Sequence, residues 1–189
     1  MKADKTGLAN PALSGSDLVS AIPSLENRAA IDVFAFSNVP SAYLNMDDLV
    51  RLKDYIQQLA GKGYTGVVIT HGTDTMEETA YFLDITLQST IAVVLTGAQR
   101  NPSLVSSDGP ANLLDSILTA ADDRTPEMGV VIVFASEIVA AREATKFHRT
   151  RVDTFKSLEF GPLGVVNNDR VIWYRKPLEA KKYIIEKAE

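Results

Sequence analysis

The 189-residue chain contains no cysteine, only two histidines and a single tryptophan. Without cysteine there can be no disulfide framework, no thiolate nucleophile and no cysteine-ligated metal site. His71 and His148 lie far apart in the chain, whereas transition-metal sites usually use three or four imidazole or thiolate ligands. The sequence therefore predicts no metal site, and its lack of cysteine leaves the compartment of the protein open.

Long apolar runs and nucleotide-binding motifs are also missing. No run approaches the roughly 20 residues that span a bilayer, and the first residues contain no apolar signal-peptide region. There is no G-x-G-x-x-G motif, and the Gly-Lys-Gly at residues 61–63 lacks the Walker spacing. The 24 acidic and 19 basic residues give a net charge of −5, which argues against nucleic acid or an anionic membrane as the main partner. A small-molecule ligand fits better.

What is present is an alternation of strand-like and helix-like patterns in a chain with 46% hydrophobic residues. Buried parallel strands are predicted at 31–36, 66–70, 91–96 and 130–134. Amphipathic helices are predicted at 17–22, 47–60, 76–87 and 109–121. Shorter strand-like segments follow at 137–142, 163–166 and 171–174. The sequence predicts an α/β fold, a mostly parallel sheet flanked by helices, with a short β-rich excursion near the C-terminal end.

Small polar residues follow three of these predicted strands, at residues 37–41, 70–74 and 96–98. Because the carboxyl ends of parallel strands meet at one edge of a sheet, we expect these residues to line one crevice for a small ligand. Thr73 and Asp74 are the strongest candidates. Thr75, with Glu78 three residues later, and Asp108 are interpreted as helix caps.

Lys146 and the two histidines are the other groups that could carry chemistry. A lysine held against Thr73 and Asp74 could take a hydroxyl proton. His71 could act as a general base, but a histidine at a strand end is interpreted here as a hydrogen-bonded structural residue. His148 is predicted to be exposed.

The motifs themselves resemble a known family. Residues 70–80, Thr-His-Gly-Thr-Asp-Thr-Met-Glu-Glu-Thr-Ala, resemble the signature of bacterial-type L-asparaginases. The resemblance continues in order through 95–100, 107–113, 145–146, 155–157 and 160–164, and so covers nearly the whole chain. It implies a three-layer, flavodoxin-like N-terminal domain of an amidohydrolase that releases ammonia from L-asparagine and, to varying degrees, L-glutamine. It also implies that no cofactor is needed, and a homo-oligomer, a tetramer built as a dimer of dimers.

The resemblance also implies roles for individual residues. Thr73, Asp74 and Lys146 match the family's threonine–lysine–aspartate catalytic group, and Asp74 is also expected to hold the α-amino group of the substrate. Ser41 matches the serine that binds the α-carboxylate. Ala98 matches the alanine whose carbonyl lies near the side-chain amide. A weak hydroxyl nucleophile needs a nearby base, and a zwitterionic substrate needs one partner for each charge.

Three departures from the family pattern shape our expectations. The usual nucleophile lies in a Thr-Gly-Gly-Thr-Ile motif, which does not occur in the 189 residues, and the lid tyrosine has no evident counterpart. Ala42 stands where the family often has glutamine. We expect an incomplete α/β domain at 1–176, lacking its first strand, and a linker at 177–189 toward a C-terminal domain. Such a fragment is expected to be unstable alone and inactive or impaired.

Two alternatives stay open at this point. The chain could be a catalytically dead amino-acid-binding or interaction module that retains Ser41 and Asp74. It could also be a glutaminase, or an amidotransferase subunit that supplies ammonia. The compartment, cytoplasmic or periplasmic, is not predicted.

Overall fold

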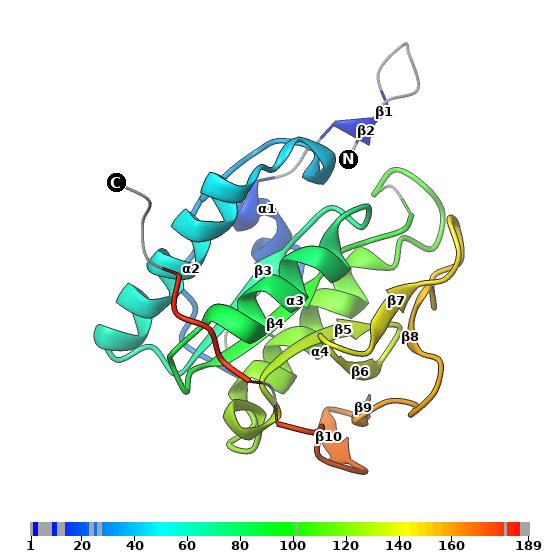
Figure 1. The fold of residues 1–189 in the computed structure, drawn as a ribbon. Helices are drawn as coiled ribbons and strands as arrows, with labels where there is room; N and C mark the ends of the chain where they lie inside the picture. Colours follow the sequence, from blue (N-terminus) through cyan, green and yellow to red (C-terminus); the bar gives the residue numbers. More distant parts are fainter. Residues whose placement is uncertain are drawn as a thin grey trace.

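A computed structural model describes residues 2–3, 9–10, 14–22, 25, 28–100, 102–179 and 181–185. A small hairpin of β1 (Lys2–Ala3) and β2 (Ala9–Asn10) lies apart from the main sheet (Figure 1). Residues 180 and 186–189 of the expected linker lie outside the described residues. In the described part of the chain, no helix is both long and apolar enough to cross a membrane.

The main sheet has the strand order β10-β9-β6-β5-β4-β3. Its core is parallel, because β3 pairs with β4 and β4 with β5 in the same direction, whereas β6, β9 and β10 are antiparallel to their neighbours. The six strands are β3 (Gly66–Thr70), β4 (Ala92–Thr96), β5 (Val130–Phe134), β6 (Glu137–Ala140), β9 (Gly164–Asn167) and β10 (Arg170–Trp173). Outside this sheet, β7 (Ala144–Lys146) pairs with β8 (Phe155–Ser157).

Helices cover both faces of the parallel core (Figure 1). Side chains alternate between the faces of a strand, so Val93 and Leu95 of β4 pack on one side and Val94 on the other. The first side joins the apolar stripes of α2 (Met46–Gly61) and α3 (Met76–Thr86), and the second joins residues of α4 (Gly109–Ala121). Every residue of β4 and β5 is buried as a result. This arrangement confirms the three-layer α/β fold and its antiparallel excursion near the C-terminal end.

The helices begin and end close to the predicted positions. The first two helices start with a capping box. The side chain of Ser14 or Asn45 accepts a hydrogen bond from the backbone N–H of an aspartate three residues later. The carboxylate of that aspartate accepts in turn from the backbone N–H of Ser14 or Asn45. The helices are α1 (Gly15–Ser20), α2 (Met46–Gly61), α3 (Met76–Thr86) and α4 (Gly109–Ala121), with 3₁₀ turns η2 (Ser41–Tyr43) and η3 (Thr125–Met128).

The predicted strand at 31–36 is wrong. The segment has no regular secondary structure, and β3 is the last strand at this side of the described sheet. Its apolar residues pack on aromatic side chains of α2 and its C-terminal loop instead: the Phe34 ring lies 5.7 Å from Tyr55 and 6.0 Å from Tyr64. Phe34 stays 48% exposed. β-propensity alone therefore did not produce a strand in this segment.

The C-terminal segment contains no helix in its described residues, 177–179 and 181–185. Arg142 Nη1 donates to the Leu178 carbonyl at 2.7 Å, and the Tyr183 N–H donates to the Ile85 carbonyl at 2.7 Å. These bonds hold the segment against the end of α3.

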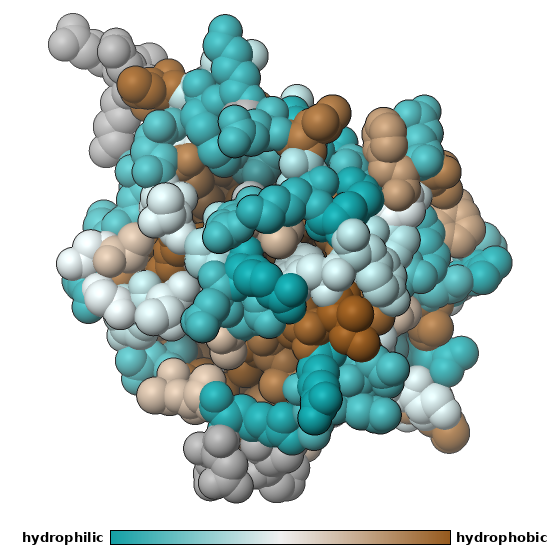
Figure 2. All heavy atoms as spheres, turned by 90° about the horizontal axis from the view of Figure 1, so that it is seen from below, coloured by the Kyte–Doolittle hydropathy of each residue, from teal (hydrophilic) through white to brown (hydrophobic). Residues whose placement is uncertain are grey.

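The face seen from below in Figure 2 is mostly hydrophilic, and hydrophobic side chains appear there mainly in hollows between polar ones.

We expect the layer between α3 and the sheet to dominate stability. Leu83 is fully buried in that layer, whereas Leu178 is 79% exposed. Leu83→Ala should lower the free energy of unfolding by about 2–5 kcal/mol, because it removes apolar contacts and leaves a cavity. Leu178→Ala is the matched control and should change it by less than about 0.5 kcal/mol. Urea unfolding measures both, and equal effects would contradict this account of the core.

Candidate functional site

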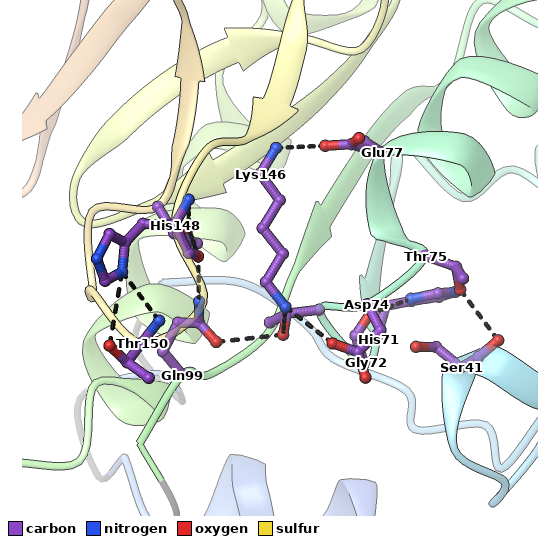
Figure 3. A network of polar contacts seen from close by, with 12 residues as sticks. Ser41, His71, Gly72, Asp74, Thr75, Glu77, Gln99, Lys146, His148 and Thr150 are labelled. Atoms are coloured by element: carbon purple, nitrogen blue, oxygen red, sulfur yellow. Dashed lines mark hydrogen bonds and ion pairs between the residues drawn. The ribbon is translucent and has the colours of Figure 1, made fainter.

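Polar side chains gather where β3 and β4 end and where β7 passes them (Figure 3). The loop after β3 carries Thr73 and Asp74, the loop after β4 carries Gln99, and β7 ends at Lys146. We refer to Thr73, Asp74, Gln99 and Lys146, together with the neighbouring Ser41, as the candidate site. It lies at the carboxyl edge of the parallel strands, where ligands of such sheets bind.

Lys146 is the centre of this group. Its Nζ donates to Thr73 Oγ1 at 2.9 Å and to Asp74 Oδ1 at 2.9 Å. The Lys146 side chain is only 16% exposed, whereas the Asp74 side chain is 75% exposed. A buried hydroxyl and an open carboxylate therefore share one ammonium group, and the carboxylate remains accessible to a ligand.

Glu77 fixes the backbone of that lysine. It lies in the first turn of α3, and its carboxylate accepts the backbone N–H of Lys146. On the other side, β7 pairs with β8, which places Lys146 opposite Phe155. The main chain of Lys146 is thus held by a helix and by a strand, and the side chain reaches from there to Thr73.

Gln99 links the two loops of the site. Thr73 Oγ1 donates to its Oε1 at 3.2 Å, and its Nε2 donates to the His148 carbonyl at 3.4 Å. Sequence reasoning singled out neither Gln99 nor Glu77 as site residues. Both lie inside the family-like motifs, but a glutamine or glutamate in a motif gives no sign of its partner until the fold is known.

Ser41 and Ala98 also lie at this edge. Ser41 is buried in η2, and its carbonyl accepts a hydrogen bond from Thr75 Oγ1 at 3.0 Å. A Cβ at Gly72 would lie 2.7 Å from Ser41 Oγ, so the serine hydroxyl approaches the backbone of the Thr73 loop closely. Ala98 is half-buried just after β4, between Gly97 and Gln99.

Thr75 and Asp108 occupy the N-cap positions of α3 and α4, as predicted, but neither makes the side-chain capping bond that was expected of it. The Thr75 hydroxyl donates to Ser41 instead, and the Asp108 carboxylate accepts the backbone N–H groups of Gln99 and Arg100 at 3.0 and 2.8 Å. These side chains join loops of the candidate site, because tertiary partners compete successfully with the local helix end.

His71 is a structural residue, as expected. Its Nδ1 lies 2.7 Å from the Gly72 carbonyl, and its Nε2 lies 3.1 Å from the Thr79 hydroxyl. A carbonyl can only accept, so Nδ1 carries the proton and Nε2 accepts from Thr79. Burial lowers the pKa of His71 below its ordinary value of 6.5. His148, in contrast, is exposed, in agreement with the prediction.

This arrangement can bind a zwitterion and activate a hydroxyl. It offers an accessible carboxylate for a cation, hydroxyls for an anion, and an ammonium in contact with a threonine hydroxyl. Among the described residues, no three His, Asp or Glu side chains are grouped so that they could hold a metal ion. The fold and the site define an α/β protein with a threonine–lysine–aspartate group at the edge of its parallel strands.

Comparison with known proteins gives the family. Residues 1–179 match the family model described as asparaginase, N-terminal. L-asparaginase 2 of Escherichia coli is 40% identical over 161 residues, which are 85% of this chain and 46% of the relative. L-asparaginase of Bacillus licheniformis is 38% identical over 179 residues, 94% of this chain and 55% of the relative. The chain therefore belongs to the asparaginase family, as its motifs predicted.

A solved structure agrees. The crystal structure of a probable cytoplasmic L-asparaginase from Campylobacter jejuni has a TM-score of 0.90 and is 35% identical; the match covers 95% of this chain and 58% of that one. The present chain spans about half the length of the curated relatives it matches. The family and the fold are thus shared with proteins named L-asparaginase.

The buried His71 predicts a pH-dependent stability. Because its pKa is lowered in the fold, the unfolded chain binds more protons near pH 6 and stability must fall as the pH decreases. His71 contributes fully above about pH 6.5, and below that pH its contribution is lost by up to about 1.4 kcal/mol per pH unit until the lowered pKa is reached. Urea unfolding between pH 7.5 and 5 measures this slope.

Two variants isolate the contribution of this histidine. His71→Gln should remove the His71 part of the slope, whereas the matched change His148→Gln, at the exposed histidine, should leave the slope as it is. Equal slopes in the wild type and in His71→Gln would contradict the assignment of a neutral buried imidazole.

Proposed function

We propose that this chain provides the activating and substrate-holding part of an L-asparagine amidohydrolase site. The observation that carries the proposal is the double contact of Lys146 Nζ with Thr73 Oγ1 and Asp74 Oδ1, both at 2.9 Å. Membership of the asparaginase family supports the substrate class. An isolated surface lysine would give no reason to expect chemistry, whereas a mostly buried ammonium against a hydroxyl does.

The proposed substrate contacts match the charges of an α-amino acid. The accessible Asp74 carboxylate would hold the α-amino group, and the Ser41 hydroxyl would bind the α-carboxylate. The Ala98 carbonyl would accept from the side-chain amide N–H. Each group of L-asparagine then has a partner of complementary charge or hydrogen-bonding capacity.

The proposed reaction converts L-asparagine and water to L-aspartate and ammonia. A threonine hydroxyl attacks the side-chain amide carbon, the C–N bond breaks as the leaving nitrogen gains a proton, and an ester to the threonine remains. Water then cleaves that ester and restores the hydroxyl. Thr73, Lys146 and Asp74 would move protons in these steps, while the resemblance assigns the attack to a threonine of the motif that the 189 residues do not contain.

The wider organisation is also a proposal. We infer an α/β domain at 1–176 followed by a linker at 177–189, in a homo-oligomer organised as a dimer of dimers. The match to the N-terminal family model and the half-length coverage of the relatives support the domain assignment. Sedimentation of the chain would measure its oligomeric state.

Binding and turnover test the proposed function separately. By calorimetry, L-asparagine should bind the chain, and Asp74→Asn should weaken binding by about 10-fold or more, since it removes a charged partner of the α-amino group. Asp123→Asn is the matched control, because Asp123 is exposed and lies outside the candidate site. Absence of binding in the wild type would contradict the proposal.

Ammonia release from L-asparagine and L-glutamine measures the activity itself. Release from L-asparagine that falls to background in Thr73→Ala and stays unchanged in Thr90→Ala, an exposed control, would identify Thr73 as a catalytic residue of this chain. Binding without any release would instead identify a catalytically dead amino-acid-binding module. Faster release from L-glutamine would identify a glutaminase.

A further inference from the structure

The Gln99 carboxamide is fixed in one orientation. Its Nε2 donates to the His148 carbonyl at 3.4 Å, and a carbonyl can only accept, so the amide nitrogen must point that way. Its Oε1 then faces Thr73, and the backbone N–H of Gln99 is held by Asp108 at 3.0 Å. The side chain thus presents an acceptor, not a donor, to the Thr73 hydroxyl.

This orientation decides where the Thr73 proton lies. A hydroxyl has one proton to donate, and Thr73 Oγ1 donates it to Gln99 Oε1 at 3.2 Å. The same oxygen accepts a hydrogen bond from Lys146 Nζ at 2.9 Å. An oxygen lone pair of Thr73 therefore faces the ammonium, and the proton faces away from it.

We propose that Gln99 is a positioning residue that keeps the Thr73 proton directed away from Lys146. In this state Thr73 can only accept from Lys146. Transfer of the Thr73 proton to a neutral Lys146 requires the hydroxyl to rotate away from Gln99. The consequence for turnover rests on the proposed function, whereas the consequence for the lysine does not.

Other charged or titratable groups also lie near the lysine. Asp74 contacts Nζ directly, Glu77 binds the backbone N–H of Lys146, and Asp108 holds Gln99 through its backbone. His148 contributes a backbone carbonyl and carries its own titratable ring nearby. None of these residues changes in the variants below, so a difference between variants reports on position 99.

Two substitutions of similar length should act in opposite directions. Gln99→Met removes the acceptor, so Thr73 becomes free to donate to a neutral lysine, and Lys146 should lose its proton at a lower pH. Gln99→Glu keeps an acceptor and adds a negative charge, so Lys146 should lose its proton at a higher pH. Shifts of about 0.5 to 1 pH unit are expected for the gain or loss of one such interaction.

The titration of Lys146 Nζ can be followed by NMR in lysine-labelled chain, with Lys146→Met to assign the signal. This measurement needs no turnover, so it decides the role of Gln99 even where the proposed activity fails. Where ammonia is released, the acid limb of the pH–rate profile should shift in the same two directions. Gln58→Met, an exposed glutamine on α2, is the matched control and should cause no shift.

A shift to lower pH in Gln99→Met would support the proposal, because this variant removes the acceptor without adding a charge. The shift in Gln99→Glu only checks that position 99 acts on the lysine, since a nearby carboxylate stabilises an ammonium in any case. No shift, or a shift to higher pH, in folded Gln99→Met would overturn the proposal. A shift to lower pH in Gln99→Met together with no ammonia release in the wild type would support Gln99 as a positioning residue and reject the proposed function.

Discussion

The contact of one lysine with two neighbouring side chains organises the candidate site. Lys146 reaches across from β7 to Thr73 and Asp74 in the loop after β3, so residues distant in sequence meet at one edge of the sheet. Glu77 supports this reach by binding the backbone of the lysine at the start of α3. The parallel core, the helix that follows β3 and the small β7–β8 sheet all position this contact.

The Lys146–Asp74 ion pair positions the two side chains more than it stabilises the fold. Because the Asp74 side chain is 75% exposed, its pairing with Lys146 should add only about 0–1 kcal/mol to folding. The stabilising free energy comes from the apolar layers on both faces of β4 and β5. The site can therefore keep an accessible charge, since the packed core beneath it holds the loops.

Local patterns predicted the elements with continuous burial and failed where a partner was required. The sequence placed β3, β5 and α4 correctly. A continuous apolar run or a helical spacing of apolar residues can be recognised within a short stretch of sequence. Residues 31–36 are also mostly apolar but form no strand in the described sheet. Thr75 and Asp108 do occupy N-cap positions, but their side chains bond residues outside their own helices. Family-like motifs pointed to Thr73, Asp74 and Lys146, while the role of Gln99 emerged only from its two contacts.

The most direct test of the central claim is a crystal structure of the chain with L-aspartate, the product of the proposed reaction. The account predicts the α-amino group at the Asp74 carboxylate, the α-carboxylate at Ser41, and the side-chain carboxylate next to Thr73 Oγ1 and Lys146 Nζ. L-aspartate bound elsewhere on the chain, or bound at this edge with its side chain directed away from Thr73 and Lys146, would contradict it.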